Sequence, residues 1–178
     1  MPFRLHVLTA VTRPENLPRI AASLVSSCPP ELELVWHWRF DPDHHAVGGQ
    51  ALKNAMLEEI SAGADDDWVW CLDDDTAVHP RLLKTLQRWS LISWIRALVV
   101  SQQRADGRVL PAGPEHLQVG SIDIGQAILR RGLIGDLRIP EDYNGDGMFL
   151  GALLRGRTDV LYLDEVLSFH NALEGGSL

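Results

Sequence analysis

Residues 68–76, WVWCLDDDT, decide the fold class of this chain. The first five form an uninterrupted apolar run, which is typical of a central strand that is covered on both faces of a sheet. Three aspartates, Asp73, Asp74 and Asp75, follow where this strand is predicted to end. Because like charges at short range repel one another, the triplet is costly unless a cation neutralises it.

Strand and helix patterns alternate along the chain before and after this segment. Residues 4–10 and 32–40 predict two further strands, while residues 17–28 and 50–62 carry apolar side chains at helical spacing. Another helix is predicted over residues 80–89. Such alternation implies right-handed crossovers and a central, mostly parallel sheet flanked by helices, which is an α/β fold.

The second half of the chain is less regular. A hairpin is predicted within residues 97–110, and an apolar segment covers residues 122–129. A helix at 144–155 and a last strand at 160–163 complete the pattern. No internal repeat, low-complexity tract or long linker interrupts the sequence, so a single domain over residues 1–178 is expected.

Charge and composition narrow the kind of partner. The 178 residues include 16 Lys and Arg against 24 Asp and Glu, a formal net charge of -8, which argues against a nucleic-acid backbone as the partner. This balance suits a site where carboxylates hold a divalent cation against an anionic ligand. The two cysteines, Cys28 and Cys71, favour a reduced, cytoplasmic chain. No apolar stretch approaches the roughly 18 residues that a membrane span needs.

Polar clusters follow the first three predicted strands. They lie from Thr9 to Arg13, at residues 39–41 and at residues 73–75. Ligands of open α/β sheets bind outside the carboxyl ends of the strands, so these clusters are expected to meet there. Carboxylate oxygens suit Mg2+ or Mn2+, and such a cation would bridge to a diphosphate. An exposed acidic turn that caps the helix near Pro80 is the alternative interpretation of the aspartates.

A longer segment around the aspartates carries a resemblance to a known family. Residues 49–76, GQALKNAMLEEISAGADDDWVWCLDDDT, resemble the part of GT-A glycosyltransferases, especially the inverting family 2, that leads from a glycine-led helix to the DxD motif. Lys53 and Asn54 match the basic-Asn pair of that helix, and Asp73 and Asp75 match the DxD motif. The resemblance implies a GT-A, nucleotide-diphospho-sugar transferase fold.

The opening segment extends this resemblance. The sequence VLTAVTRPENL, at residues 7–17, is similar to the family's first strand and nucleotide-contacting loop. This similarity implies that Thr9, Ala10 and Arg13 lie near the base and the ribose. Asp41, after the second predicted strand, stands where the family commonly uses an acid to contact the base.

Two downstream segments resemble the acceptor side of the family. The sequence NGDGMFLGALLRGR, at residues 144–157, is similar to the helix that begins with Glu-Asp, where the Asp is the general base. Asp146 matches that Asp, while Gly145 replaces the Glu. The sequence EVLSFHNAL resembles the segment where many GT-A enzymes place a metal- or phosphate-contacting histidine, here His170.

The resemblance implies an activity in which each of these residues has a role. Asp75 and His170 would hold Mn2+ or Mg2+ against the phosphates, and Asp73 and Asp74 would contact the donor. Asp146 would deprotonate an acceptor hydroxyl, so that a sugar moves from a UDP-sugar to that hydroxyl with inversion. Residues 1–96 would form the donor half of the domain, and the remainder would form the acceptor half. A homodimer that completes a small acceptor groove stays open.

Two other functions stay open as well. The short chain favours a non-catalytic module that binds a nucleotide or sugar and regulates a partner. A sugar-phosphate nucleotidyltransferase would need a glycine-rich basic loop after the first strand, which Thr12, Arg13 and Pro14 echo only faintly. His44 and His45 look like metal ligands, but adjacent side chains point apart, so a loop is predicted there.

Overall fold

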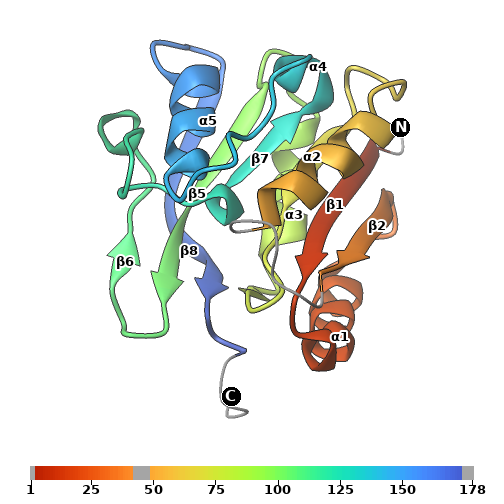
Figure 1. Cartoon of the computed structure of the whole chain (residues 1–178). Coiled ribbons are helices and arrows are strands. Elements are labelled where there is room, and N and C mark those ends of the chain that lie inside the picture. Colours follow the sequence, from red (N-terminus) through yellow and green to blue (C-terminus); the bar gives the residue numbers. More distant parts are fainter. Residues whose placement is uncertain (1–2, 42–48, 174–178) are drawn as a thin grey trace.

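A computed structural model describes residues 3–41 and 49–173 of the chain. Its centre is an eight-stranded sheet in the order β2-β1-β3-β7-β5-β8-β4, with β6 also paired to β5. The strands are β1 (Phe3–Val11), β2 (Leu32–Phe40), β3 (Trp68–Cys71), β4 (Ala77–Val78), β5 (Ala97–Arg104), β6 (Val109–Leu110), β7 (Ala127–Arg130) and β8 (Val160–His170). Strands β1, β2, β3, β5 and β8 point the same way, and β7 runs against them between β3 and β5 (Figure 1). The predicted α/β fold with a mostly parallel sheet is confirmed.

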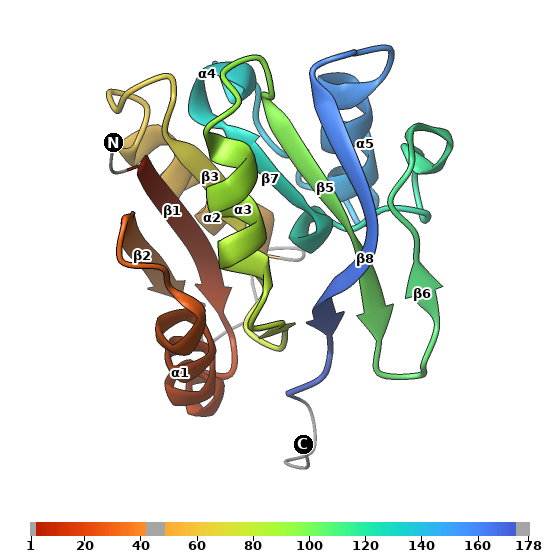
Figure 2. The same cartoon turned by 180° about the vertical axis from the view of Figure 1, so that it is seen from behind.

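Helices cover both faces of this sheet. They are α1 (Leu17–Ser27), α2 (Gln50–Glu59), α3 (Leu82–Ser90), α4 (Arg131–Ile134) and α5 (Gly145–Leu154). Helices α2, α4 and α5 lie on the face seen in Figure 1, and α1 and α3 lie on the face seen in Figure 2. No helix within residues 3–41 and 49–173 is long and apolar enough to cross a membrane.

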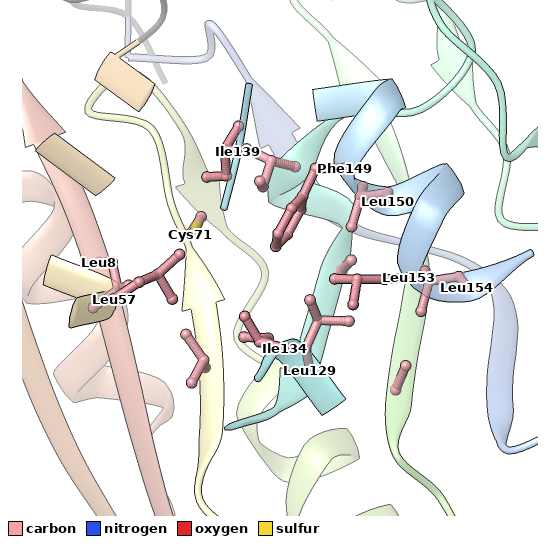
Figure 3. Packing of buried hydrophobic residues seen from close by; sticks show 14 of the residues in the cluster. Leu8, Leu57, Cys71, Leu129, Ile134, Ile139, Phe149, Leu150, Leu153 and Leu154 are labelled. Carbon is pink, nitrogen blue, oxygen red and sulfur yellow. The ribbon is translucent and has the colours of Figure 1, made fainter. Parts of the chain in front are cut away.

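The apolar run of β3 is explained by these two layers. Trp68 and Trp70 point into the core shared with α1 and α3, and Val69 and Cys71 point into the core shared with α2 and α5. Phe149 of α5 packs into the second core, as Figure 3 shows. Alternate side chains of β3 therefore serve opposite faces, which is why none of its four residues is polar.

Two elements differ from the predicted pattern. The last strand was expected at residues 160–163, but β8 continues to His170 through the exposed pair Asp164 and Glu165. The pairing of β8 with β5 shifts register beside Val100 and Ser101, so the strand continues past a polar interruption that breaks its apolar alternation. The apolar segment at 122–129 divides into a short 3-10 turn and strand β7.

Candidate active site

A cleft of about 550 Å³ opens at the carboxyl ends of the parallel strands. The ends of β1, β5 and β8, the segment after β3, the loop before β7 and the first turn of α5 form its walls. Seven of the residues predicted for the site line it, namely Ala10, Arg13, Asp73, Asp74, Asp75, Asp146 and His170. The sheet therefore brings together polar clusters that are far apart in the sequence, as the rule for open α/β sheets predicts.

Asp74 joins the ends of β1 and β3. Its Oδ2 accepts hydrogen bonds from the backbone N–H groups of Thr12 at 2.6 Å and Arg13 at 2.7 Å, and from the Thr12 hydroxyl at 3.0 Å. Asp74 is buried, so these bonds compensate the desolvation of its carboxylate. The middle aspartate therefore shapes the loop after β1.

Asp75 forms an ion pair across the same junction. Nη1 of Arg13 donates to Oδ2 of Asp75 at 2.6 Å, while Oδ1 of Asp75 lies 3.7 Å from Nδ1 of His170. Burial raises the pKa of the Asp75 carboxyl, and the charge of Asp73 raises it further. Arg13 is thereby fixed at the wall of the cleft.

Asp73 is held in place by the buried side chain of Lys53. Nζ of Lys53 donates to Oδ1 of Asp73 at 2.5 Å, and Lys53 is only 1% exposed. Burial opposes the charge on Lys53, but Asp73 and Asp146 outweigh it and hold the lysine pKa above its usual value. Gly49 lets α2 begin close enough for this contact, since its φ is +69° and a Cβ there would lie 2.3 Å from Cβ of Ala10. Lys53 thus supports the cleft without lining it.

Asp73, Asp123 and His170 form a group that fits a metal ion. One ligand atom from each lies within 4.8 Å of the other two. Nδ1 of His170 is buried, has no hydrogen-bond partner among the residues that the structure describes, and lies 4.0 Å from Oδ2 of Asp73. Two carboxylates and an imidazole are a suitable donor set for Mn2+ or Mg2+. Asp75, predicted as the ligand beside His170, is not one of the three.

Asp123 is a residue that the sequence interpretation missed. It begins the short turn before β7, where its Oδ1 accepts from the Gly125 N–H at 2.8 Å and Gln126 completes a capping box. That spacing of Asp and Gln is visible in the sequence, but it predicts a turn and not a ligand. Burial, reinforced by the charge of Asp73, raises the pKa of Asp123 to about 6.

Asp146 occupies the first turn of α5, on another wall of the cleft. Its Oδ1 is buried and has no hydrogen-bond partner in the described part of the chain. Burial raises the pKa of Asp146, Lys53 works in the opposite direction, and Asp73 adds to the increase. A Cβ at Gly145 would lie 2.2 Å from the Pro140 carbonyl oxygen, so the Glu that the family has at this position has no room here.

Gln50, the first residue of α2, is a second residue that the interpretation missed. It lines the cleft, is 3% exposed, and favours the ionised form of Asp146, which lowers the pKa of that carboxyl. Its Nε2 also donates to the Asp142 carbonyl at 3.1 Å, while its Oε1 is buried without a partner among the described residues. Gln50 therefore links the start of α2 to the loop before α5 at the cleft wall.

Four predicted residues do not line the cleft, namely Lys53, described above, and Thr9, Asn54 and Asp41. Thr9 is fully buried and its hydroxyl accepts from Nε1 of Trp36 at 3.0 Å. The Asn54 side chain bonds both the carbonyl and the N–H of Ile139, at 2.8 and 2.9 Å. Asp41 is buried at the end of β2. Thr9 and Asn54 thus link neighbouring elements of the fold. Neither of them lines the cleft, and Asp41 does not line it either.

The histidine pair His44 and His45 lies outside the described residues. The loop predicted for it therefore stays a prediction.

Comparison with known proteins finds similar folds but no similar sequence family. No protein-family model matches the sequence, and no curated protein matches it at a significant level. The structure of TarS residues 1–349 from S. aureus superposes with a TM-score of 0.67 at 18% identity, over 94% of this chain and 60% of that one. The same fragment in complex with UDP-GlcNAc gives 0.66 at 16% identity, over 94% and 58%.

A viral protein gives a further match. It is a glycosyltransferase involved in the glycosylation of the major capsid of PBCV-1, with a TM-score of 0.57 at 11% identity, over 97% of this chain and 95% of that one. The chain thus has a GT-A-like fold and spans about three fifths of the TarS fragment.

Proposed function

We propose that this chain is a glycosyltransferase that moves a sugar from a nucleoside diphosphate sugar, with UDP as the nucleotide, to an acceptor hydroxyl. One observation carries the proposal: the group of Asp73, Asp123 and His170 shares a cleft with Asp146. The group suits a metal-bound diphosphate, and the carboxylate suits a proton acceptor. The fold agrees, since TarS was crystallised with UDP and with UDP-GlcNAc.

Asp73, Asp123 and His170 would hold the Mn2+ or Mg2+ ion. Nδ1 of His170, which has no partner within the described ranges, fits such an ion together with the two carboxylates, because a buried acceptor without a ligand is costly. When bound, the cation would offset the negative charge that develops on the leaving diphosphate. Lys53 keeps Asp73 in place for this role.

Different walls of the cleft would bind the donor and the acceptor. Ala10, Thr12 and Arg13, at the end of β1, would border the nucleotide, in the half formed by residues 1–96. Arg13 is held for that purpose by Asp75, and the loop that carries it is held by Asp74. Apart from Asp123 and His170, which would hold the metal ion, residues 97–178 would supply the acceptor side, chiefly through α5.

Asp146 would act as the general base. As the acceptor oxygen attacks the anomeric carbon, its proton passes to the Asp146 carboxylate, and the bond from that carbon to the diphosphate oxygen breaks. The nucleoside diphosphate leaves with the bonding electrons, so this single displacement inverts the anomeric carbon. Burial raises the pKa of Asp146 towards neutral pH, and a general base is most effective when its pKa lies near the working pH.

The two alternative functions predict different residues. A nucleotidyltransferase would need a glycine-rich loop after β1, yet that place is occupied by Thr12, Arg13 and Pro14. A non-catalytic module would need the donor cleft only. In the same cleft, Oδ1 of Asp146 is buried and has no partner in the part of the chain that the structure describes, which favours catalysis over binding alone.

Calorimetry with nucleotides tests the proposal. UDP and GDP are titrated with and without Mn2+ into the wild type, Asp73→Asn, and the control Asp66→Asn, which alters an exposed aspartate before the start of β3. We expect Mn2+-dependent UDP binding that disappears in Asp73→Asn and persists in Asp66→Asn. Absence of nucleotide binding by the folded wild type under every metal condition would contradict the proposal.

A further inference from the structure

Arg104 ends strand β5 and lines the cleft. In the pairing of β5 with β8, Arg104 lies opposite His170, a member of the metal-fitting group. Its backbone is fixed by a hydrogen bond from its N–H to the Arg108 carbonyl at 2.8 Å, across the β5–β6 turn. The arginine is therefore positioned by the sheet at a wall of the cleft.

The other cations near the cleft are already engaged. Arg13 pairs with Asp75 and Asp74, and Lys53 pairs with Asp73. Within residues 3–41 and 49–173, by contrast, the guanidinium of Arg104 makes no hydrogen bond or ion pair, although five aspartates line the same cleft. A half-buried arginine kept apart from so many carboxylates is available for an anion from outside the chain.

The strand order separates this cation from Arg13. Arg13 follows the end of β1, and β5 is three positions from β1 along the order β1-β3-β7-β5, which corresponds to about 14 Å at a spacing of about 4.8 Å. Asp73 follows β3, which lies between them. Arg13 and Arg104 thus lie on opposite sides of Asp73, with Arg104 in the half formed by residues 97–178, so an anion bound at Arg13 does not account for Arg104.

We propose that Arg104 forms an oxyanion subsite on the acceptor side of the cleft, and that the acceptor carries a phosphate or carboxylate group near its reacting hydroxyl. The planar guanidinium binds either group through two parallel N–H donors. It also offsets the repulsion that an anionic acceptor meets from the aspartates. The inference rests on the proposed transferase function, since it assigns the second substrate of that site.

Binding to the nucleotide-loaded protein tests the subsite. The chain is saturated with UDP and Mg2+, and the Nε–H signals of its arginines are followed by NMR during titration with glucose 6-phosphate, with methyl phosphate as a minimal probe and glucose as the uncharged control. We expect both phosphates to shift the Arg104 signal, with glucose 6-phosphate binding about ten-fold or more tighter than glucose, as a charge-assisted hydrogen bond predicts.

Substitutions test whether Arg104 is the residue that causes the preference for phosphate probes. Arg104→Gln should abolish the preference for the phosphates and leave UDP affinity unchanged, and Arg104→Lys should retain part of it. Arg108→Gln is the matched control, because Arg108 is an exposed arginine of the same hairpin that does not line the cleft. Equal binding of phosphate and neutral probes by the UDP-loaded wild type would overturn the subsite while leaving the donor site intact.

A ten-fold loss of UDP affinity in Arg104→Gln would also overturn it, since Arg104 would then serve the donor diphosphate. Failure of the wild type to bind UDP at all is a separate result, which contradicts the proposed function itself.

Discussion

Asp146 lines the cleft, and one of its carboxylate oxygens is buried without a hydrogen-bond partner in residues 3–41 and 49–173. If this oxygen accepts the proton of the acceptor, Asp146→Asn should lower kcat by about 10²- to 10⁴-fold, the usual contribution of a general base. The affinity for UDP should change little, because the amide keeps the shape of the side chain. Steady-state transfer rates and calorimetry on the same preparation measure both quantities. A variant that transfers sugar at the wild-type rate would exclude Asp146 as the base.

Because of Asp123, the stability of the fold and the binding of a metal in the cleft should depend on pH. Its pKa of about 6 lies above the value of about 3.9 for an unfolded aspartate, so without a metal its ionisation opposes folding. This cost is absent below pH 4 and is fully present above pH 6. A cation that binds the ionised carboxylate removes the cost, and protonation at low pH displaces the cation.

We therefore predict that saturating Mn2+ raises the melting temperature more at pH 7 than at pH 5. Thermal denaturation at the two pH values measures this difference. In Asp123→Asn the metal effect should be smaller at pH 7 and less dependent on pH. An equal stabilisation by Mn2+ at both pH values in the wild type would argue against Asp123 as a ligand.

Individual site residues were predictable from the sequence to different degrees. Asp73, Asp146 and His170 were placed at the site by their motifs, and all three line the cleft. Their chemical roles stay predictions. Asp123 and Arg104 carry no local signal, because their positions depend on how β7 and β5 pair with strands far away in the sequence.

At the scale of elements, helix α5 begins in close contact with the chain before it. A Cβ at Gly145 would lie 2.2 Å from the Pro140 carbonyl oxygen, whereas a Cβ at Gly151 of the same helix would meet its nearest atom at 3.5 Å. Gly145→Ala should therefore destabilise the fold by about 1–3 kcal/mol through overpacking. Gly151→Ala should instead stabilise it by about 1 kcal/mol, as alanine favours helix.

Urea denaturation of the two alanine variants measures this contrast. Equal stabilities for both would show that the start of α5 moves away from Pro140 without cost. Because Asp146 follows Gly145 directly, we also expect Gly145→Ala to slow transfer, and Gly151→Ala to leave it unchanged.

Helix α2 is tied to the chain before α5 by Asn54. Its side chain makes two hydrogen bonds to the Ile139 backbone. Asn54→Ala should lower the free energy of unfolding by about 1–3 kcal/mol, since two partly buried backbone groups lose their partner. If Asn54 has this structural role alone, calorimetry should give the wild-type affinity for UDP. A loss of UDP affinity without a loss of stability would instead favour the nucleotide contact that the family resemblance implies.

Elements with a strong periodic pattern were predictable, and those defined by pairing were not. Strand β2 and helix α2 follow their apolar spacing, and β3 follows its continuous apolar run. The direction of β7 was not predictable, because a four-residue apolar strand fits a parallel or an antiparallel neighbour equally well. The second half of β8 was missed since Asp164 and Glu165 interrupt its apolar alternation.

For the molecule as a whole, the size of the chain bears on the choice between catalysis and binding. The chain spans about three fifths of the TarS fragment, so that fragment holds parts with no counterpart in these residues. It spans 95% of the PBCV-1 glycosyltransferase, however, which shows that a glycosyltransferase of similar length exists. Under the proposed function, the length of this chain is thus no argument against transfer, and acceptor specificity would lie in the small cleft.

Locating the metal tests the central claim most directly. Crystals grown with UDP and Mn2+ give an anomalous difference map in which manganese is identified without reference to a model. The account predicts one manganese peak in the cleft, bound by Asp73, Asp123 and His170, with the UDP diphosphate beside it. A peak bound by other residues, or a nucleotide outside the cleft, would contradict it.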